Sequence, residues 1–154
     1  MRMRSRINKK LDAGYCRSAQ EATSAKRTNL LGYARPMSAV ALKALQDVPC
    51  GDLFLQNKYN GHRCMIINDA GKNIAYSKNG KIIESIPEIL EEINIPEGVI
   101  LDGELYHHGT ALQTISSWVR KHQDNSKLLT FVCFDTIIEG SFERRYEFLK
   151  RLDL

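Results

Sequence analysis

Short runs of apolar residues in the middle of the chain predict a β-sheet. Three stretches rich in β-branched and aromatic residues, at 52–58, 62–68 and 73–78, have the composition of strands. The second and third are separated by residues 69–72 (DAGK), where glycine accepts a positive φ and aspartate favours a turn, so we expect a hairpin there. A second turn, at residues 78–81 (KNGK), ends the third strand.

Two further strands are predicted downstream of this hairpin. Residues 99–108 (VILDGELYHH) alternate, which places two leucines on one face and Asp102 and Glu104 on the other. Residues 128–138 (LLTFVCFDTII) are almost continuously apolar, which is typical of a central strand. The sheet is therefore expected to include both segments.

Helices are predicted where an N-cap, a starting proline or a 3.6-residue apolar period occurs. The segments are residues 2–13, 38–47, 86–94, 110–122 and 141–154. Together with the strands they predict an α+β fold, a largely antiparallel sheet with flanking helices.

Composition fits one soluble globular domain. The chain has 154 residues, of which 43% are hydrophobic and 26% charged, and no apolar run is long enough to span a bilayer. The charged N-terminus lacks the apolar stretch of a secretory signal. Four widely spaced cysteines with no metal-binding pattern indicate reduced thiols and a cytoplasmic protein: Cys16, Cys50, Cys64 and Cys133.

Positive charge is concentrated at the start of the chain. Residues 1–35 hold nine Lys and Arg against two acids, a net charge of +7, so the rest must carry −3 to give the overall +4. This basic lead-in suits contact with a polyanion such as nucleic acid, and a solvated helix face is the alternative. The residues expected to contact nucleic acid are Arg2, Arg4, Arg6, Lys9 and Lys10.

A polar, cationic segment, residues 58–63 (KYNGHR), directly precedes an apolar strand. A lysine attacks phosphorus only as the neutral amine, so a nucleophilic Lys58 needs surroundings that disfavour its charge and a turn that aims it. Gly61 permits a tight turn beside a phosphate, and Arg63 can bind a phosphate or ribose oxygen. Taken alone, these residues also fit an ordinary turn.

Three more polar clusters accompany strands. Residues 77–81 (SKNGK) offer a hydroxyl and two cations to a phosphate, or form a plain hairpin turn. Asp102 and Glu104 share a strand face and can hold Mg²⁺ or a ribose hydroxyl, unless that face is simply solvated. Gly103 between them indicates close approach of a ligand. Phe134 can stack on a purine or pack in the core.

The order of these four clusters resembles the nucleotidyltransferase domain of ATP-dependent DNA ligases, a family that also includes RNA ligases and mRNA capping enzymes. Lys-x-x-Gly-x-Arg is followed by Ser-Lys-Asn-Gly, Asp-Gly-Glu-Leu and Phe-x-x-Phe-Asp within residues 31–149. Small phage-type or bacterial ligases look most similar. The resemblance implies an ATP-grasp-like nucleotidyltransferase fold, with a basic lead-in at 1–35 and the N-terminal part of the adenylation domain at 36–154.

In that family a lysine attacks the α-phosphorus of ATP, and the AMP it receives is passed to the 5′-phosphate of a DNA nick. The resemblance implies that Lys58 is the nucleophile and that Mg²⁺ binds at Asp102 and Glu104. It implies ATP as cofactor and nicked double-stranded DNA as partner. The residues expected to contact the nucleotide are Gln56, Arg63, Lys78, Glu104 and Phe134.

The sequence departs from the family pattern at several positions. Asn60 replaces the usual Asp, Gln56 replaces a frequent Glu, and Lys78 keeps the charge of an Arg without its planar fork. The last carboxylate motif, the Lys-x-Lys motif and the OB-fold are not found in this sequence. We therefore expect a fragment, a split enzyme that a second polypeptide completes, or a diverged protein that binds without joining.

Two alternatives stay open. The chain could be a ligase-like module that binds nucleotide, DNA or a partner without catalysis. It could also be an RNA ligase or capping-type nucleotidyltransferase, because these share the Lys-x-x-Gly-x-Arg cluster.

Overall fold

The computed structural model describes residues 2–5, 36, 41, 43 and 51–152. The chain divides into two compact units, Met1–Lys58 and Tyr59–Leu154, each described by itself. Within the described ranges, no helix is long and apolar enough to cross a membrane.

The first unit contains a two-stranded sheet. Strand β1 (Arg2–Ser5) pairs antiparallel with β2 (Gly51–Phe54). The helix predicted over residues 2–13 is therefore wrong at its start. The run RMRS alternates with a period of two, which suits a strand better than a helix. The rest of that segment and the helix predicted at 38–47 lie almost wholly outside the described residues.

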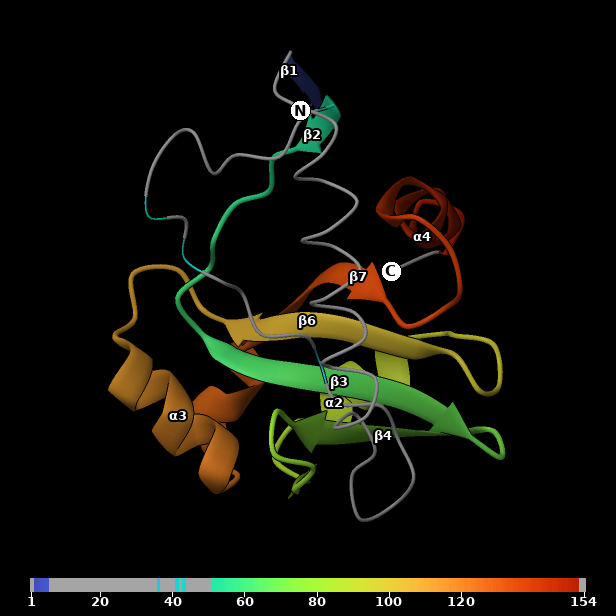
Figure 1. The fold of residues 1–154 in the computed structure, drawn as a ribbon. Helices are drawn as coiled ribbons and strands as arrows, with labels where there is room; N and C mark the ends of the chain where they lie inside the picture. Colours follow the sequence, from blue (N-terminus) through green and yellow to red (C-terminus); the bar gives the residue numbers. More distant parts are fainter. Residues whose placement is uncertain (1, 6–35, 37–40, 42, 44–50, 153–154) are drawn as a thin grey trace. The chain divides into compact units, whose positions relative to one another are not determined.

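The second unit is built on a five-stranded sheet in the order β5-β4-β3-β6-β7, in which all neighbours are antiparallel (Figure 1). This confirms the predicted α+β class and the largely antiparallel sheet. The strands are β3 (His62–Asp69), β4 (Lys72–Ser77), β5 (Ile82–Ile83), β6 (Ile100–Tyr106) and β7 (Thr130–Thr136).

The predicted hairpin joins β3 to β4. Asp69 pairs with Lys72, and the two turn residues Ala70 and Gly71 have φ values of 51° and 80°. Two successive positive φ angles give the turn a twist that matches that of the strands it connects. The second predicted turn is also present, because the Gly80 amide donates to the Ser77 carbonyl at 2.8 Å.

In the described part of the second unit, three α-helices and a 3₁₀-helix accompany the sheet. Helix α2 (Pro87–Glu92) begins at a proline, and α4 (Phe142–Leu149) is capped by Ser141, whose Oγ accepts from the Arg144 amide. Both starts confirm the sequence signals. The other elements are α3 (Leu112–Arg120) and η2 (Asp124–Leu128).

The hydrophobic core lies between one face of the sheet and the helices. Alternate residues of β3 and β6 project into it, and the apolar stripe of α3 packs against them. The core members from these three elements are Cys64, Ile66, Leu101, Leu105, Ile115, Trp118 and Val119. The amphipathic period of residues 110–122 therefore predicted the buried face of α3 correctly.

Strand β7 differs from its prediction. It lies at the edge of the five-stranded sheet, and most of its side chains are only partly buried, so it is not central. A continuous apolar run indicates burial on both faces but cannot show how many strands flank it. Helix α4 is joined to β7 by Arg145, whose guanidinium donates to both Asp135 carboxylate oxygens at 2.7 and 3.0 Å.

A neighbouring strand lies against Gly103, where the sequence predicted the close approach of a ligand. The register shifts between Asp102 and Gly103, and the Phe131 ring of β7 lies over the glycine. A Cβ at this position would lie 2.5 Å from the ring and 2.6 Å from the Val132 carbonyl oxygen. Close approach of a neighbouring strand therefore explains this mid-strand glycine.

We expect Gly103→Ala to lower the free energy of unfolding by about 3 kcal/mol, because the methyl group overlaps a ring and a backbone oxygen. Gly109→Ala is the matched control. Its Cβ would meet nothing within 4 Å, so only the cost of placing alanine at φ 75° remains, about 1 kcal/mol. Urea unfolding of both variants measures the difference. Equal losses would contradict the proposed packing role of Gly103.

Candidate functional site

The segment that follows Lys58 is attached to β6 at every second residue. The Tyr59 ring meets Tyr106 edge-on, with centroids 5.1 Å apart, and the Gly61 amide donates to Glu104 Oε1 at 3.2 Å. Arg63 binds Asp102. Since β3 and β6 run antiparallel, alternate residues of one meet alternate residues of the other in reverse order.

The Arg63–Asp102 ion pair is bidentate. Arg63 Nε and Nη2 donate to Asp102 Oδ1 and Oδ2, both at 2.6 Å. The Asp102 side chain is 7% exposed and that of Arg63 is 26% exposed. Burial raises the pKa of Asp102 above its ordinary value, and the hydrogen bonds and charge of Arg63 oppose that rise.

Phe134 completes this arrangement on β7. The Arg63 guanidinium carbon lies 4.6 Å from the centre of the Phe134 ring, a cation–π contact. The structure therefore brings together four of the predicted site residues from three neighbouring strands: Arg63, Asp102, Glu104 and Phe134. Stacking of adenine on Phe134 remains a prediction.

Gly61 is required where the segment crosses β6. A Cβ at this position would lie 2.2 Å from the Leu105 carbonyl oxygen and 2.8 Å from Glu104 Cγ. No side chain fits in that space, so the glycine lets the backbone lie against β6 and its amide reach Glu104.

The predicted residues of the other compact unit are described separately. Gln56 and Lys58 are exposed and lie between the end of β2 and Tyr59. For Arg2 and Arg4 only the backbone strand is described, while Arg6, Lys9 and Lys10 lie outside the described residues. The predicted roles of all seven residues stay predictions.

The described residues offer limited support for Mg²⁺. Both oxygens of Asp102 accept from Arg63, and one oxygen of Glu104 accepts from Gly61, so Asp102 fits better as a positioning residue for Arg63. Among the residues that the structure describes, no group of three or more His, Cys, Asp or Glu could hold a metal ion. Mg²⁺ binding at Asp102 and Glu104 remains a prediction.

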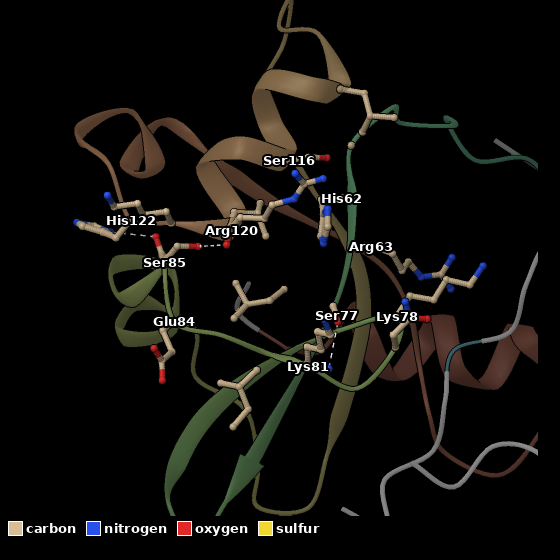
Figure 2. A pocket seen from close by; sticks show the side chains of 17 residues that line it. His62, Arg63, Ser77, Lys78, Lys81, Glu84, Ser85, Ser116, Arg120 and His122 are labelled. Carbon is tan, nitrogen blue, oxygen red and sulfur yellow. Dashed lines mark hydrogen bonds between the residues drawn. The ribbon is translucent and has the colours of Figure 1, made fainter. Parts of the chain in front are cut away.

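A pocket of about 950 Å³ lies at the start of β3, lined by residues from β3, the β4–β5 turn and α3. Figure 2 shows His62, Ser116 and Arg120 on one side of β3, whereas the side chains of Arg63 and Lys78 extend to the other side. Burial and the nearby Arg120 charge lower the pKa of His62. The sequence patterns do not reveal this pocket, although the period-two alternation of β3 places His62 and Arg63 on opposite faces of the strand.

The position of Arg120 in its helix is enough to explain this cation from the sequence. It lies in the last turn of α3, where a cation complements the helix dipole, and nothing in the sequence places it beside His62. Tyr59 and Tyr106 were missed as a pair for the same reason. The register of β3 on β6 brings Tyr59 beside Tyr106, and the packing of α3 against β3 brings Arg120 near His62.

Comparison with known proteins supports the family that the motifs indicate. The sequence profile of the family described as "ATP dependent DNA ligase domain" matches residues 34–152. A search of curated proteins found no match. Two solved structures that match, titled "Pmar-Lig_Pre." and "Pmar-Lig_PreS3", are each 21% identical over 61% of this chain, with TM-scores of 0.49 and 0.50. The chain covers 25% of each of them, and the similarity concerns the fold alone.

We expect Arg63→Met to destabilise the fold more than Asp102→Asn, because it leaves the more deeply buried partner charged and unpaired. The double variant should lose less than the sum of the two, with a coupling free energy of about 1–3 kcal/mol. Urea unfolding at neutral pH of the unaltered chain, the two single variants and the double variant measures the four free energies of this double-mutant cycle.

The pH dependence of the free energy of unfolding provides a control for this double-mutant cycle. Without Arg63, the raised pKa of Asp102 makes the folded state bind a proton more readily than the unfolded state. Stability of Arg63→Met should therefore recover as the pH falls through the raised pKa, and the double variant with Asn at 102 should show no such recovery. Additive losses without recovery would argue against the ion pair.

Proposed function

The chain belongs to the ATP-dependent DNA ligase domain family, and from this premise we propose that it accepts AMP from ATP on Lys58 and serves the sealing of nicks in DNA. The proposal includes an ATP-grasp-like nucleotidyltransferase fold, for which the five-stranded antiparallel sheet with flanking helices is the supporting observation. Nicked double-stranded DNA would be the second substrate.

One observation carries the proposal. The backbone directly after Lys58 is fixed to β6 by the Tyr59–Tyr106, Gly61–Glu104 and Arg63–Asp102 contacts. A nucleophile must be held in line with the phosphorus it attacks, and effective positioning accounts for much of the rate of such a transfer. A solvated turn would not need an attachment at every second residue.

The proposed reaction is the one that membership of this family implies. The neutral amine of Lys58, after losing a proton to solvent, forms a bond from Nζ to the α-phosphorus of ATP. The bond from this phosphorus to the bridging oxygen breaks, and pyrophosphate leaves with the electron pair. The AMP on Lys58 then passes to the 5′-phosphate of the nick, and the 3′-hydroxyl displaces it.

The other predicted residues bind and orient the nucleotide in this scheme. Lys78 extends to the same side of β3 as Arg63, so two cations can stabilise the negative charge that spreads over the phosphate oxygens (Figure 2). Glu104 would accept from a ribose hydroxyl, Phe134 would stack on adenine, and Gln56 would read the adenine edge.

Lys58 labelling tests the proposal directly. The full chain is incubated with α-labelled ATP and Mg²⁺, denatured and analysed by gel electrophoresis, and we expect an acid-labile label that Lys58→Ala abolishes. Lys72→Ala is the control, because Lys72 is an exposed lysine at the β3–β4 turn and should keep the label. A label that persists in Lys58→Ala would contradict the assignment, and so would the absence of label even when a polypeptide carrying the family's C-terminal motifs is added in trans.

Asn60 provides a second test, because the family usually has Asp at this position. We expect Asn60→Asp to raise the rate of AMP transfer to Lys58 about tenfold, equivalent to ~1.4 kcal/mol of barrier, since a carboxylate beside the lysine can accept a hydrogen bond from the amine and hold it in line with the phosphorus. Asn57→Asp adds the same charge on the other side of Lys58 and is the matched control. Equal rates in the two variants would show that only the added charge matters.

A further inference from the structure

Strand β7 contains one residue more than the stretch of β6 that it faces. Asp102 of β6 lies opposite Asp135. The next residue of β6, Gly103, lies opposite Cys133. Phe134 is therefore the extra residue of a β-bulge, in which two residues of one strand face a single residue of the other. Bulges change the direction of a side chain and are frequent next to active sites.

The bulge places two consecutive side chains of β7 on the same side of the sheet. Asp135 lies opposite Asp102 and therefore projects from the same face. The Phe134 ring also lies on this face, against the Arg63 guanidinium that binds Asp102. In a regular strand, neighbouring side chains point to opposite faces. Without the bulge, Phe134 and Asp135 could not both project on the side of the ion pair.

The thiol of Cys133 connects the two strands at the bulge. Its Sγ lies 3.4 Å from the Asp135 carbonyl oxygen and 3.7 Å from the Asp102 carbonyl oxygen. Burial raises the pKa of this thiol to about 12, so it keeps its proton at neutral pH and can donate to either oxygen. Both oxygens belong to the residue pair beside the extra residue. A donor at position 133 therefore stabilises the bulged backbone.

Arg145 of α4 holds the second residue of the bulge by its side chain. It donates to both carboxylate oxygens of Asp135 at 2.7 and 3.0 Å, and the two side chains are 11% and 16% exposed. Arg145 Nη1 also donates to the Gly140 carbonyl at 2.9 Å, and the Phe142 ring centre lies 5.5 Å from the guanidinium carbon. A bidentate pair fixes the orientation of both partners. The direction of Asp135 is therefore set from a helix.

We propose that Arg145 and Cys133 are positioning residues that hold Phe134 in place for stacking against the base of a nucleotide. Both act through the ring and not by touching the nucleotide. Cys133 precedes Phe134 and Arg145 fixes the residue that follows it, so the ring is held from both sides. A ring that is already in place binds a base more tightly, because ordering it on binding costs free energy. The stacking of a base rests on the proposed function.

The Arg63 Nε–H signal in NMR reports the position of the Phe134 ring without any ligand, because an aromatic ring shifts the signal of a proton near its face. Phe134→Leu removes the ring and defines that shift. We expect Arg145→Met to move the signal toward its position in Phe134→Leu. Arg144→Met is the matched control, because it removes the same charge from the neighbouring exposed residue of α4. It should leave the signal in place.

Binding of ATP to the full chain, measured by isothermal titration calorimetry, tests the consequence for the nucleotide. Phe134→Leu should weaken ATP binding about tenfold, the loss expected for a stacked base. Arg145→Met should weaken it about threefold, since a displaced ring keeps part of the stacking, and Arg144→Met should not. In the Phe134→Leu background, Arg145→Met should cause no additional loss, because the two substitutions act through the same ring.

Inorganic tripolyphosphate separates positioning of the ring from a general loss of structure or charge. It has no base to stack, so its affinity should be equal in Arg145→Met and Arg144→Met. A variant that is merely less well folded would bind both ligands more weakly.

Cys133 provides a second pair of variants that leaves α4 unchanged. Cys133→Ser keeps a donor at the bulge, whereas Cys133→Val replaces the thiol by a group of similar size that cannot donate. We expect the serine variant to keep the Arg63 signal and the ATP affinity of the unaltered chain. The valine variant should change both in the same direction as Arg145→Met.

Three results would overturn the inference: an Arg63 signal that Arg145→Met leaves in place, equal weakening of ATP and tripolyphosphate, or additive losses in the variant that combines Arg145→Met with Phe134→Leu. An unaltered chain that binds no ATP contradicts the proposed function, and the Arg63 signal then still decides whether Arg145 and Cys133 hold the ring. A chain that takes the Lys58 label but shows the same Arg63 signal in both arginine variants keeps the function and loses the inference.

Discussion

The ion pair between Arg63 and Asp102 is the constraint on which the rest of the candidate site depends. Its two hydrogen bonds of 2.6 Å join β3 to β6 directly after the segment that carries Lys58. Burying two charges is costly unless the geometry is good, and the bidentate fork together with the Phe134 ring supplies that geometry. Because Arg63 is held, Gly61 lies against β6 and its amide reaches Glu104.

Fixing one residue of a strand also fixes the direction of its neighbours. With Arg63 turned toward β6 and β7, His62 must point to the opposite side, where it lies near Arg120 and Ser116 (Figure 2). A single register therefore places the Arg63 ion pair on one side of β3 and the His62 ring on the other. A slip of one residue would exchange them and would place Cys64 and Ile66 outside the core.

Within the described residues, the sequence predicted the turns and the helix starts of the second unit because these signals are local. The β3–β4 turn, Pro87 at the start of α2 and Ser141 at the start of α4 each follow from residues a few positions apart. It could not predict the partners of Asp102 or the neighbour of Gly103, since these depend on how strands 30 to 40 residues apart are paired. The pocket beside His62 was missed for the same reason.

The central claim is that the nucleotide binds on the side of β3 to which Arg63 points, and a titration of the ¹⁵N-labelled chain with AMP, followed by NMR, tests it most directly. The account predicts that the Gly61 amide and Arg63 Nε signals shift, while the Ser116 amide and Arg120 Nε signals stay in place. Shifts confined to Ser116 and Arg120 would contradict it, because the nucleotide would then lie on the side of β3 opposite the Arg63 side chain.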